Sequence, residues 1–120
     1  VSPNDKMIYE EVAAKAHLSN NNSNIGLVVG ATYPDDLKKV RKICPEMPIL
    51  LPGVGTQGGE LSKSIVAGIN KNGRNLIINS SRSIIYASND PKTFAQAARK
   101  KAIEFQQNIN VILEKIGKGW

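Results

Sequence analysis

Apolar and polar positions divide the 120-residue chain into two kinds of segment. Three short runs, residues 25–30, 48–51 and 75–79, are almost wholly apolar and rich in branched side chains. Such runs are typical of strands that are buried on both faces of a parallel sheet. The segments around them carry apolar residues every three or four positions, which is the spacing of one helix face. The pattern therefore predicts helices that alternate with three buried strands.

The helix boundaries follow from capping residues and prolines. The expected helices run from a cap at Asn4 or Asp5 to about Leu18, from Pro34 to a stop at Pro45, over about residues 59–69, and from an Asp90 cap and Pro91 to about Ile116. The apolar faces expected to point inward are Ile8, Val12 and Ala16; Leu37, Val40 and Ile43; Leu61, Ile65, Val66 and Ile69; and Phe94, Ala98, Ala102, Phe105, Ile109, Ile112 and Ile116.

This order of helices and strands predicts an α/β fold with a parallel sheet. We expect residues 1–120 to form a single, partial domain, because no linker divides the chain. Two architectures fit the order equally: part of a (β/α)8 barrel, and a small doubly wound sheet. Ligands bind at the carboxyl ends of the strands in both, so residues just after each strand are the candidates for function.

Composition narrows the function classes. The net charge is +6, but the lysines are spread along the predicted helices and few aromatic residues are available for stacking, so we expect no nucleic-acid partner. No apolar run approaches the ~20 residues that span a bilayer, and the first residues carry no signal-peptide pattern. Cys44 is the only cysteine and His17 the only histidine. We therefore expect a cytoplasmic protein without membrane partner, disulfide, metal or other cofactor.

A glycine-rich loop follows the second predicted strand. Gly53, Gly55 and Gly58 fit the spacing G-x-G-x-x-G, and the loop runs into a predicted helix. Free backbone N–H groups at a helix start favour an anion, and the Gln57 amide could add a donor. The third predicted strand ends in a run of serines that contains Arg82, whose guanidinium can bind a phosphate with two hydrogen bonds. Together the two loops predict a phosphate site.

The same glycine spacing also occurs in dinucleotide-binding folds. A dinucleotide site would need an acidic residue about 20 residues after the glycines, to bind the ribose. The third strand ends instead in Asn79, Ser80, Ser81 and Arg82. An arginine there suits a 2′-phosphate, so an NADP-binding oxidoreductase stays open, as does a non-catalytic phosphate-binding module.

Three stretches of the chain resemble the orotidine 5′-monophosphate decarboxylase family, in its longer bacterial-type branch. They are IGLVVGATYPDDLKKVR (25–41), ILLPGVGTQGGEL (49–61) and LIINSSRSIIYAS (76–88). The resemblance implies the C-terminal part of a (β/α)8 barrel, with the three strands as its sixth, seventh and eighth. It further implies a dimeric carboxy-lyase of pyrimidine biosynthesis that converts OMP to UMP and CO2.

The resemblance also implies roles for individual residues. The 5′-phosphate of the nucleotide would be held by Gln57, Ser81, Arg82 and Gly58, and a mobile loop over residues 55–59 would close on it. The pyrimidine side of the pocket and its loop would involve Pro52, Gly53, Val54 and Gly55.

The catalytic cluster of that family, Asp-x-Lys-x-x-Asp, is absent from this sequence. Two partial matches begin at residues 36 and 90, but Arg41 and Ala95 stand where the second acid belongs. We therefore expect this chain not to decarboxylate OMP alone. Three strands taken from a barrel would leave unpaired edges and an open interior, so we expect association with another copy or with the missing N-terminal half.

Overall fold

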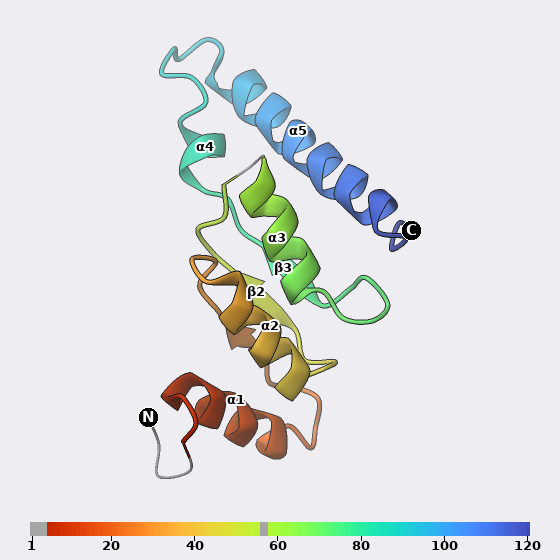
Figure 1. Ribbon diagram of the computed structural model, residues 1–120. Coiled ribbons are helices and arrows are strands. Elements are labelled where there is room, and N and C mark those ends of the chain that lie inside the picture. The colour runs from red at the N-terminus through yellow and green to blue at the C-terminus, as the bar shows by residue number, and fades with distance from the viewer. Residues whose placement is uncertain (1–4, 56–57) are drawn as a thin grey trace.

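The computed structural model describes residues 5–55 and 58–120 of the chain. It contains a three-stranded parallel sheet in the order β1-β2-β3, flanked by helices (Figure 1). The predicted parallel α/β fold is therefore confirmed. The elements are α1 (Ile8–Ser19), β1 (Leu27–Val28), α2 (Pro34–Ile43), β2 (Ile49–Leu51), α3 (Gly59–Gly68), β3 (Leu76–Ile78), α4 (Arg82–Ile85) and α5 (Phe94–Lys115).

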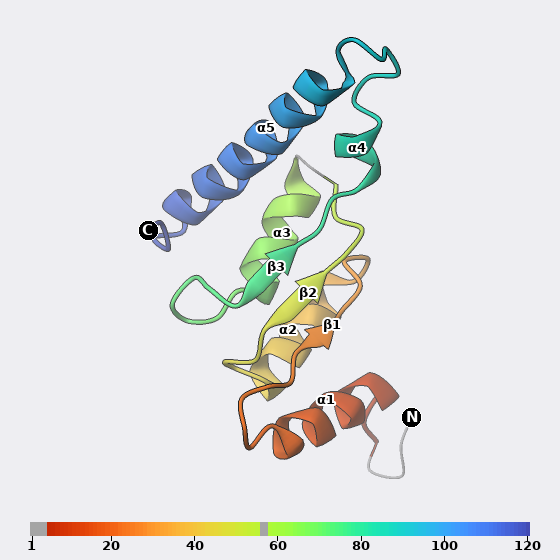
Figure 2. The same ribbon diagram turned by 180° about the vertical axis from the view of Figure 1, so that it is seen from behind.

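The helices between the strands lie on one side of the sheet. Figure 2 shows the strands in front of α2 and α3, and no helix of the described chain covers the face turned to the viewer. Each strand pairs with the next in sequence, with Leu27 opposite Ile49 and Ile49 opposite Leu76. A doubly wound sheet has helices on both faces, whereas a barrel wall has them outside only. The arrangement is that of a barrel wall.

The core lies between the sheet and this helical layer. Ile49 and Leu51 of β2 are fully buried against the helices, and Leu50 between them points to the opposite face. Leu37 and Leu61 close the core from α2 and α3. Each such side chain contributes about 1.5–3 kcal/mol on burial, so this single layer supplies much of the stability of the chain.

The other face of the sheet is open to solvent. Val28 is 71% exposed and Ile77 is 58% exposed, so the prediction that the strands are buried on both faces is wrong for this chain. Successive side chains of a strand alternate between the faces, and only one face has helices to cover it. The apolar composition of the strands therefore corresponds to a surface that nothing in the described chain covers.

Two helix starts differ from the prediction. Asp5 has a φ of 57° and does not cap α1; the Glu10 carboxylate accepts a hydrogen bond from the Met7 N–H at 3.0 Å instead. The alternative cap, Asn4, lies outside the described residues. Asp90 does not cap α5, because its carboxylate accepts from the Lys92 N–H at 2.9 Å within a turn, and α5 begins at Phe94.

The apolar faces of α3 and α5 are narrower than predicted. Val66 was expected to point inward but is 55% exposed, because it lies off the Leu61–Ile65 stripe. Along α5, Phe105 is buried but Phe94 is 54% exposed, since the helix extends beyond the short sheet (Figure 1). Leu113, which the pattern missed, is buried. Parts of both apolar helix faces therefore stay uncovered by the described residues.

Gly73, in the turn between α3 and β3, and Gly117, just after α5, offer a matched test of backbone strain. Gly73 and Gly117 have φ of 74° and 68°, a region that costs other residues about 1–2 kcal/mol. A Cβ on Gly73 would also lie 2.9 Å from the Lys118 carbonyl oxygen, whereas one on Gly117 would meet nothing. We expect Gly117→Ala to cost about 1 kcal/mol and Gly73→Ala about 1–3 kcal/mol more. Urea denaturation of both variants measures the difference, and equal losses would contradict the packing argument.

Candidate functional site

The carboxyl ends of the three strands point to the same end of the sheet (Figure 2). The loop after β2 carries Pro52, Gly53, Val54 and Gly55, and it leads to Gly58 at the start of α3. Ser81 and Arg82 follow β3 at the start of α4. Gln57 lies outside the described residues. The other candidates thus lie on neighbouring loops at the end of the sheet where α/β folds bind ligands.

Two glycines that flank the loop after β2 adopt positive φ angles. Gly53 and Gly58 have φ of 78° and 86°, which side-chain-bearing residues rarely adopt. A Cβ built on either glycine would have open space around it. These two glycines are therefore needed for the path of the backbone, and the space beside them is available to a ligand. Val54 differs, because it is only 6% exposed and packs in the core.

A hollow of about 360 Å³ joins the loops after β1 and β2. Gly53, Val54 and Gly55 form one wall of it. The remaining walls come from the loop after β1, the start of α2 and the first turns of α3: Ala31, Thr32, Pro34, Glu60, Lys63 and Ser64. Arg82 does not line this hollow. The hollow therefore joins the loop after β2 to α3, whereas Arg82 lies after the neighbouring strand β3, at the start of α4.

The segment after β3 presents a cation and several hydroxyl groups. Arg82 is exposed, and its guanidinium has no hydrogen bond or ion pair to any other described residue. The Ser80 and Ser83 hydroxyls bond each other at 2.6 Å, and Asn79 Nδ2 donates to Ser81 Oγ at 3.2 Å. Ser81 keeps its own hydroxyl proton for another acceptor. Arg82 and Ser81 can therefore both donate to an incoming anion.

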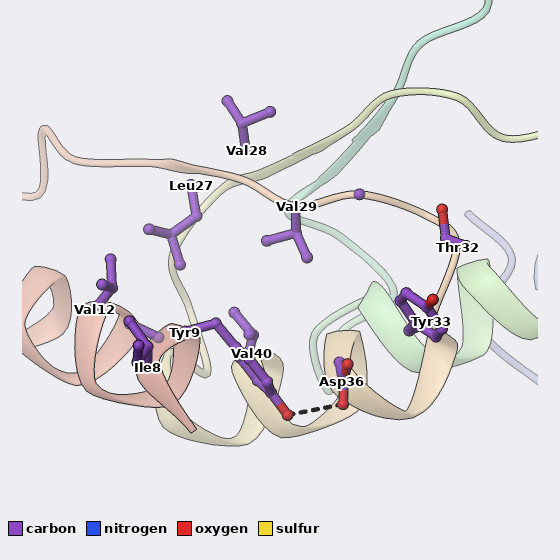
Figure 3. A pocket seen from close by; sticks show the side chains of 12 residues that line it. Ile8, Tyr9, Val12, Leu27, Val28, Val29, Thr32, Tyr33, Asp36 and Val40 are labelled. Carbon is purple, nitrogen blue, oxygen red and sulfur yellow. Dashed lines mark hydrogen bonds between the residues drawn. The ribbon is translucent and has the colours of Figure 1, made fainter. Parts of the chain in front are cut away.

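Neither partial match to the catalytic motif lies at a strand end. Asp36 belongs to the first turn of α2 and accepts a hydrogen bond from the Tyr9 hydroxyl at 2.7 Å (Figure 3). That hydrogen bond raises the pKa of Tyr9. Asp90 and Lys92 lie in the turn before α5. In the part of the chain that the structure describes, no group of three His, Cys, Asp or Glu side chains could hold a metal ion.

Arg41 has a structural role that the sequence alone did not reveal. This α2 residue is only 7% exposed, and burial lowers the pKa of its guanidinium. Its nitrogen atoms donate to carbonyl oxygens at the end of α3 and at the starts of β2 and β3. Arg41 falls on the same helix face as Leu37, Val40 and Cys44 by its spacing. A charged residue on this apolar face was the sequence feature that could have indicated a buried arginine.

Parallel strands with helices on one side of them, and a glycine loop at the carboxyl end of β2, define a segment of an α/β barrel, a class of protein in which ligands bind at those strand ends. The chain belongs to the orotidine 5′-phosphate decarboxylase / HUMPS family, whose sequence profile matches residues 3–98. This finding confirms the family resemblance and favours the barrel over the doubly wound sheet. None of the helices in the described part is long and apolar enough to cross a membrane.

Individual relatives agree with this assignment. The chain is 46% identical over 106 residues to an orotidine 5′-phosphate decarboxylase of Cupriavidus metallidurans, and 49% identical over 105 residues to one of Dehalococcoides mccartyi. These alignments cover 88% of the chain in both cases but only 39% and 38% of the relatives. The chain thus spans about two fifths of the length of the curated proteins it matches.

Solved structures give the same result. The structure of Leishmania donovani OMP decarboxylase superposes with a TM-score of 0.68 at 34% identity, over 91% of this chain and 40% of that one. Leishmania donovani UMP synthase superposes with a TM-score of 0.67 at 39% identity, over 87% of this chain and 23% of that one. The three strands and their helices therefore correspond to part of a larger barrel.

Proposed function

We propose that this chain supplies the nucleotide phosphate-binding part of an orotidine 5′-phosphate decarboxylase, a lyase of pyrimidine biosynthesis that converts OMP to UMP and CO2. The observation that carries the proposal is that, in a member of this family, a glycine loop and an arginine follow two neighbouring strands at the same end of the sheet. A glycine loop with φ of 78° at Gly53 and 86° at Gly58 follows β2, and Arg82, without a partner among the described residues, follows β3.

The chemistry of a phosphate monoester suits these groups. The Arg82 guanidinium can donate two parallel hydrogen bonds to phosphate oxygens, and Ser81 can donate a third. Gly58 stands at the start of α3, where unpaired N–H groups favour negative charge. In the proposal Gln57 adds a side-chain amide, and Pro52, Gly53, Gly55 and the backbone of Val54 lie toward the pyrimidine. The Asp and Lys residues that carry out the decarboxylation belong to a part of the barrel that this chain does not contain, so the chain alone is expected to be inactive.

A thermal-shift titration with UMP and NADPH tests this proposal against the dinucleotide alternative. We expect UMP to raise the unfolding temperature of the chain and NADPH to have a smaller effect, because the proposed site binds one phosphomonoester and no acidic residue follows β3 to bind a dinucleotide ribose. Uridine, which lacks the phosphate, is the matched control and should leave the temperature unchanged. Stabilisation by NADPH without stabilisation by UMP would reject the proposed function.

The same proposal requires a partner at the open edges of the sheet. The Leu27 and Val29 N–H groups bond Pro48 and Leu50 of the β2 segment, both at 2.9 Å. The backbone groups of Val28 between them therefore face away from β2, toward the outer edge. An apolar groove of about 740 Å³ runs along this edge between β1 and α1, with Leu27 and Val29 pointing into it (Figure 3).

The opposite edge of the sheet has a similar groove. It measures about 480 Å³ and lies between β3 and α5, with Leu76 and Ile78 on one side and Phe105 and Ile109 on the other. An added strand at either edge would find both backbone hydrogen-bonding groups and an apolar surface to cover. Each groove therefore fits one strand of a larger parallel barrel.

The described part of the chain has one more long helix than it has strands. This arrangement favours the rest of the barrel as the partner, rather than a second copy of the chain. Within residues 5–55 and 58–120, four helices of ten or more residues accompany three strands, with α1 before β1 and α5 after β3. If β3 of a second copy joined β1, its α5 would need the position beside β1 that α1 already occupies. A fitting partner begins and ends with a strand, as the remaining five strands of an eight-stranded barrel do. We therefore propose association with the missing N-terminal part of the barrel rather than closure by a second copy.

Co-expression tests this partner. The chain would be produced with the segment of the Cupriavidus metallidurans relative that it does not cover, and the product analysed by light scattering after size exclusion. We expect a one-to-one complex that Val28→Asp disrupts, because the charge would be buried in the barrel interior. Val66→Asp, on the exposed side of α3, is the control and should leave the complex intact. A compact monomer that ignores the added segment would contradict the proposal.

A further inference from the structure

The hollow between the loops after β1 and β2 is lined by a buried serine, Ser64, whose hydroxyl group lacks a hydrogen-bond partner among the described residues. Ser64 is only 1% exposed. No buried side-chain nitrogen or oxygen of the described chain is both fully enclosed and unpaired, so the Ser64 hydroxyl must open onto the hollow. A ligand in the hollow would give this hydroxyl its partner.

Charged groups surround the same hollow. Lys63 and Glu60 both line it, and neither forms an ion pair with another described residue. Thr32 adds a second hydroxyl from the loop after β1. Glu60 belongs to the first turn of α3. The hollow thus combines a cation and two hydroxyl donors with a single carboxylate.

We propose that this hollow binds a small oxyanion of the phosphate class, distinct from the nucleotide phosphate assigned to Arg82. Lys63 balances its charge, and Ser64 and Thr32 donate hydrogen bonds to its oxygens. The Glu60 carboxylate repels an oxyanion without a proton but accepts a hydrogen bond from a P–OH group. The site therefore prefers hydrogen phosphate or a singly charged monoester to sulfate, which carries no proton at neutral pH.

The proposed ligand would connect three segments. Thr32 lies after β1, Gly53–Gly55 after β2, and Ser64 on α3, so one bound ion contacts both loops and the helix that follows. Since binding to the folded state alone stabilises it, phosphate should raise the unfolding temperature of the whole chain. This inference uses side chains that the proposed function does not assign, and it stands if the nucleotide site is elsewhere.

An amide NMR titration of the 120-residue chain with inorganic phosphate tests the site. At constant ionic strength we expect saturable shifts at Thr32, Gly53, Gly55 and Ser64. Lys63→Gln should weaken binding about tenfold and Ser64→Ala about three- to tenfold, by loss of a charged and a neutral donor. Lys38→Gln, on the exposed side of α2, is the matched control and should bind as the parent chain does.

Two further comparisons distinguish this site from the nucleotide site and from diffuse surface charge. Sulfate should bind more weakly than phosphate, and Glu60→Gln should remove the difference. Arg82→Ala should lose UMP but keep the phosphate shifts at the hollow; loss of both would mean that only one site exists and would overturn the inference. Absence of saturable shifts, or equal losses in Lys63→Gln and Lys38→Gln, would also overturn it, since the interaction would then come from surface charge alone.

Discussion

Arg41→Ala is expected to lower the free energy of unfolding by about 3–5 kcal/mol, a large part of what a chain of this size possesses. The guanidinium donates five hydrogen bonds to backbone carbonyl oxygens, and none of its contacts is to a carboxylate. The strongest are to Met47 at 2.6 Å, and to Gly68 and Asn75 at 2.7 Å. Truncation would leave these carbonyls without donors in a partly dry environment.

The position of these carbonyls explains why the loss would spread. Gly68 ends α3, Met47 precedes β2, and Asn75 precedes β3, so one side chain connects a helix end to the starts of two strands. The Cys44 carbonyl, at the end of α2, accepts a further bond at 3.0 Å. Burial lowers the pKa of Arg41, but an arginine stays charged at any pH where the chain folds. The positive charge is therefore balanced by carbonyl dipoles that face it from several elements.

Urea denaturation measures this effect. Arg99→Ala, which removes an exposed arginine from α5, is the control and should change stability by less than about 0.5 kcal/mol. Arg41→Lys should recover only part of the loss, because an ammonium cannot reproduce the planar fork of donors. If Arg41→Ala and Arg99→Ala unfolded at the same urea concentration, the buried network would have no net role in stability.

The order of elements was predictable because it depends on local periodicity. The three apolar runs and the helical spacing between them follow from which side chains must leave water, and the parallel sheet follows from their alternation. The exposure of Val28 and Ile77 was not predictable in the same way. Composition records that a residue is suited to burial, but only the tertiary arrangement shows whether another segment covers it.

The candidate site also contains positions that were predictable from the sequence and residues that were not. The positions after β2 and β3 were predictable because strand ends converge in any parallel sheet, and the positive φ of Gly53 agrees with that reasoning. Ser64 and Arg41 were not identified, because their significance comes from partners that are distant in sequence or missing. Ser64 lies on a helix where a serine is unremarkable until its hydroxyl is found without a hydrogen bond.

Arg82→Ala is expected to weaken UMP binding about 100-fold, because a charged, two-pronged donor to the phosphate is lost. Isothermal titration of the complex formed with the rest of the barrel measures this affinity. Uridine binding should not change, since uridine has no phosphate, and Arg99→Ala should leave the affinity for both ligands as it was. Arg82→Lys should fall between the parent and Arg82→Ala, because a lysine keeps the charge but not the fork. If Arg82→Ala weakened uridine and UMP equally, the arginine would act on the shape of the site, and the phosphate would have to be bound by the loop after β2 alone.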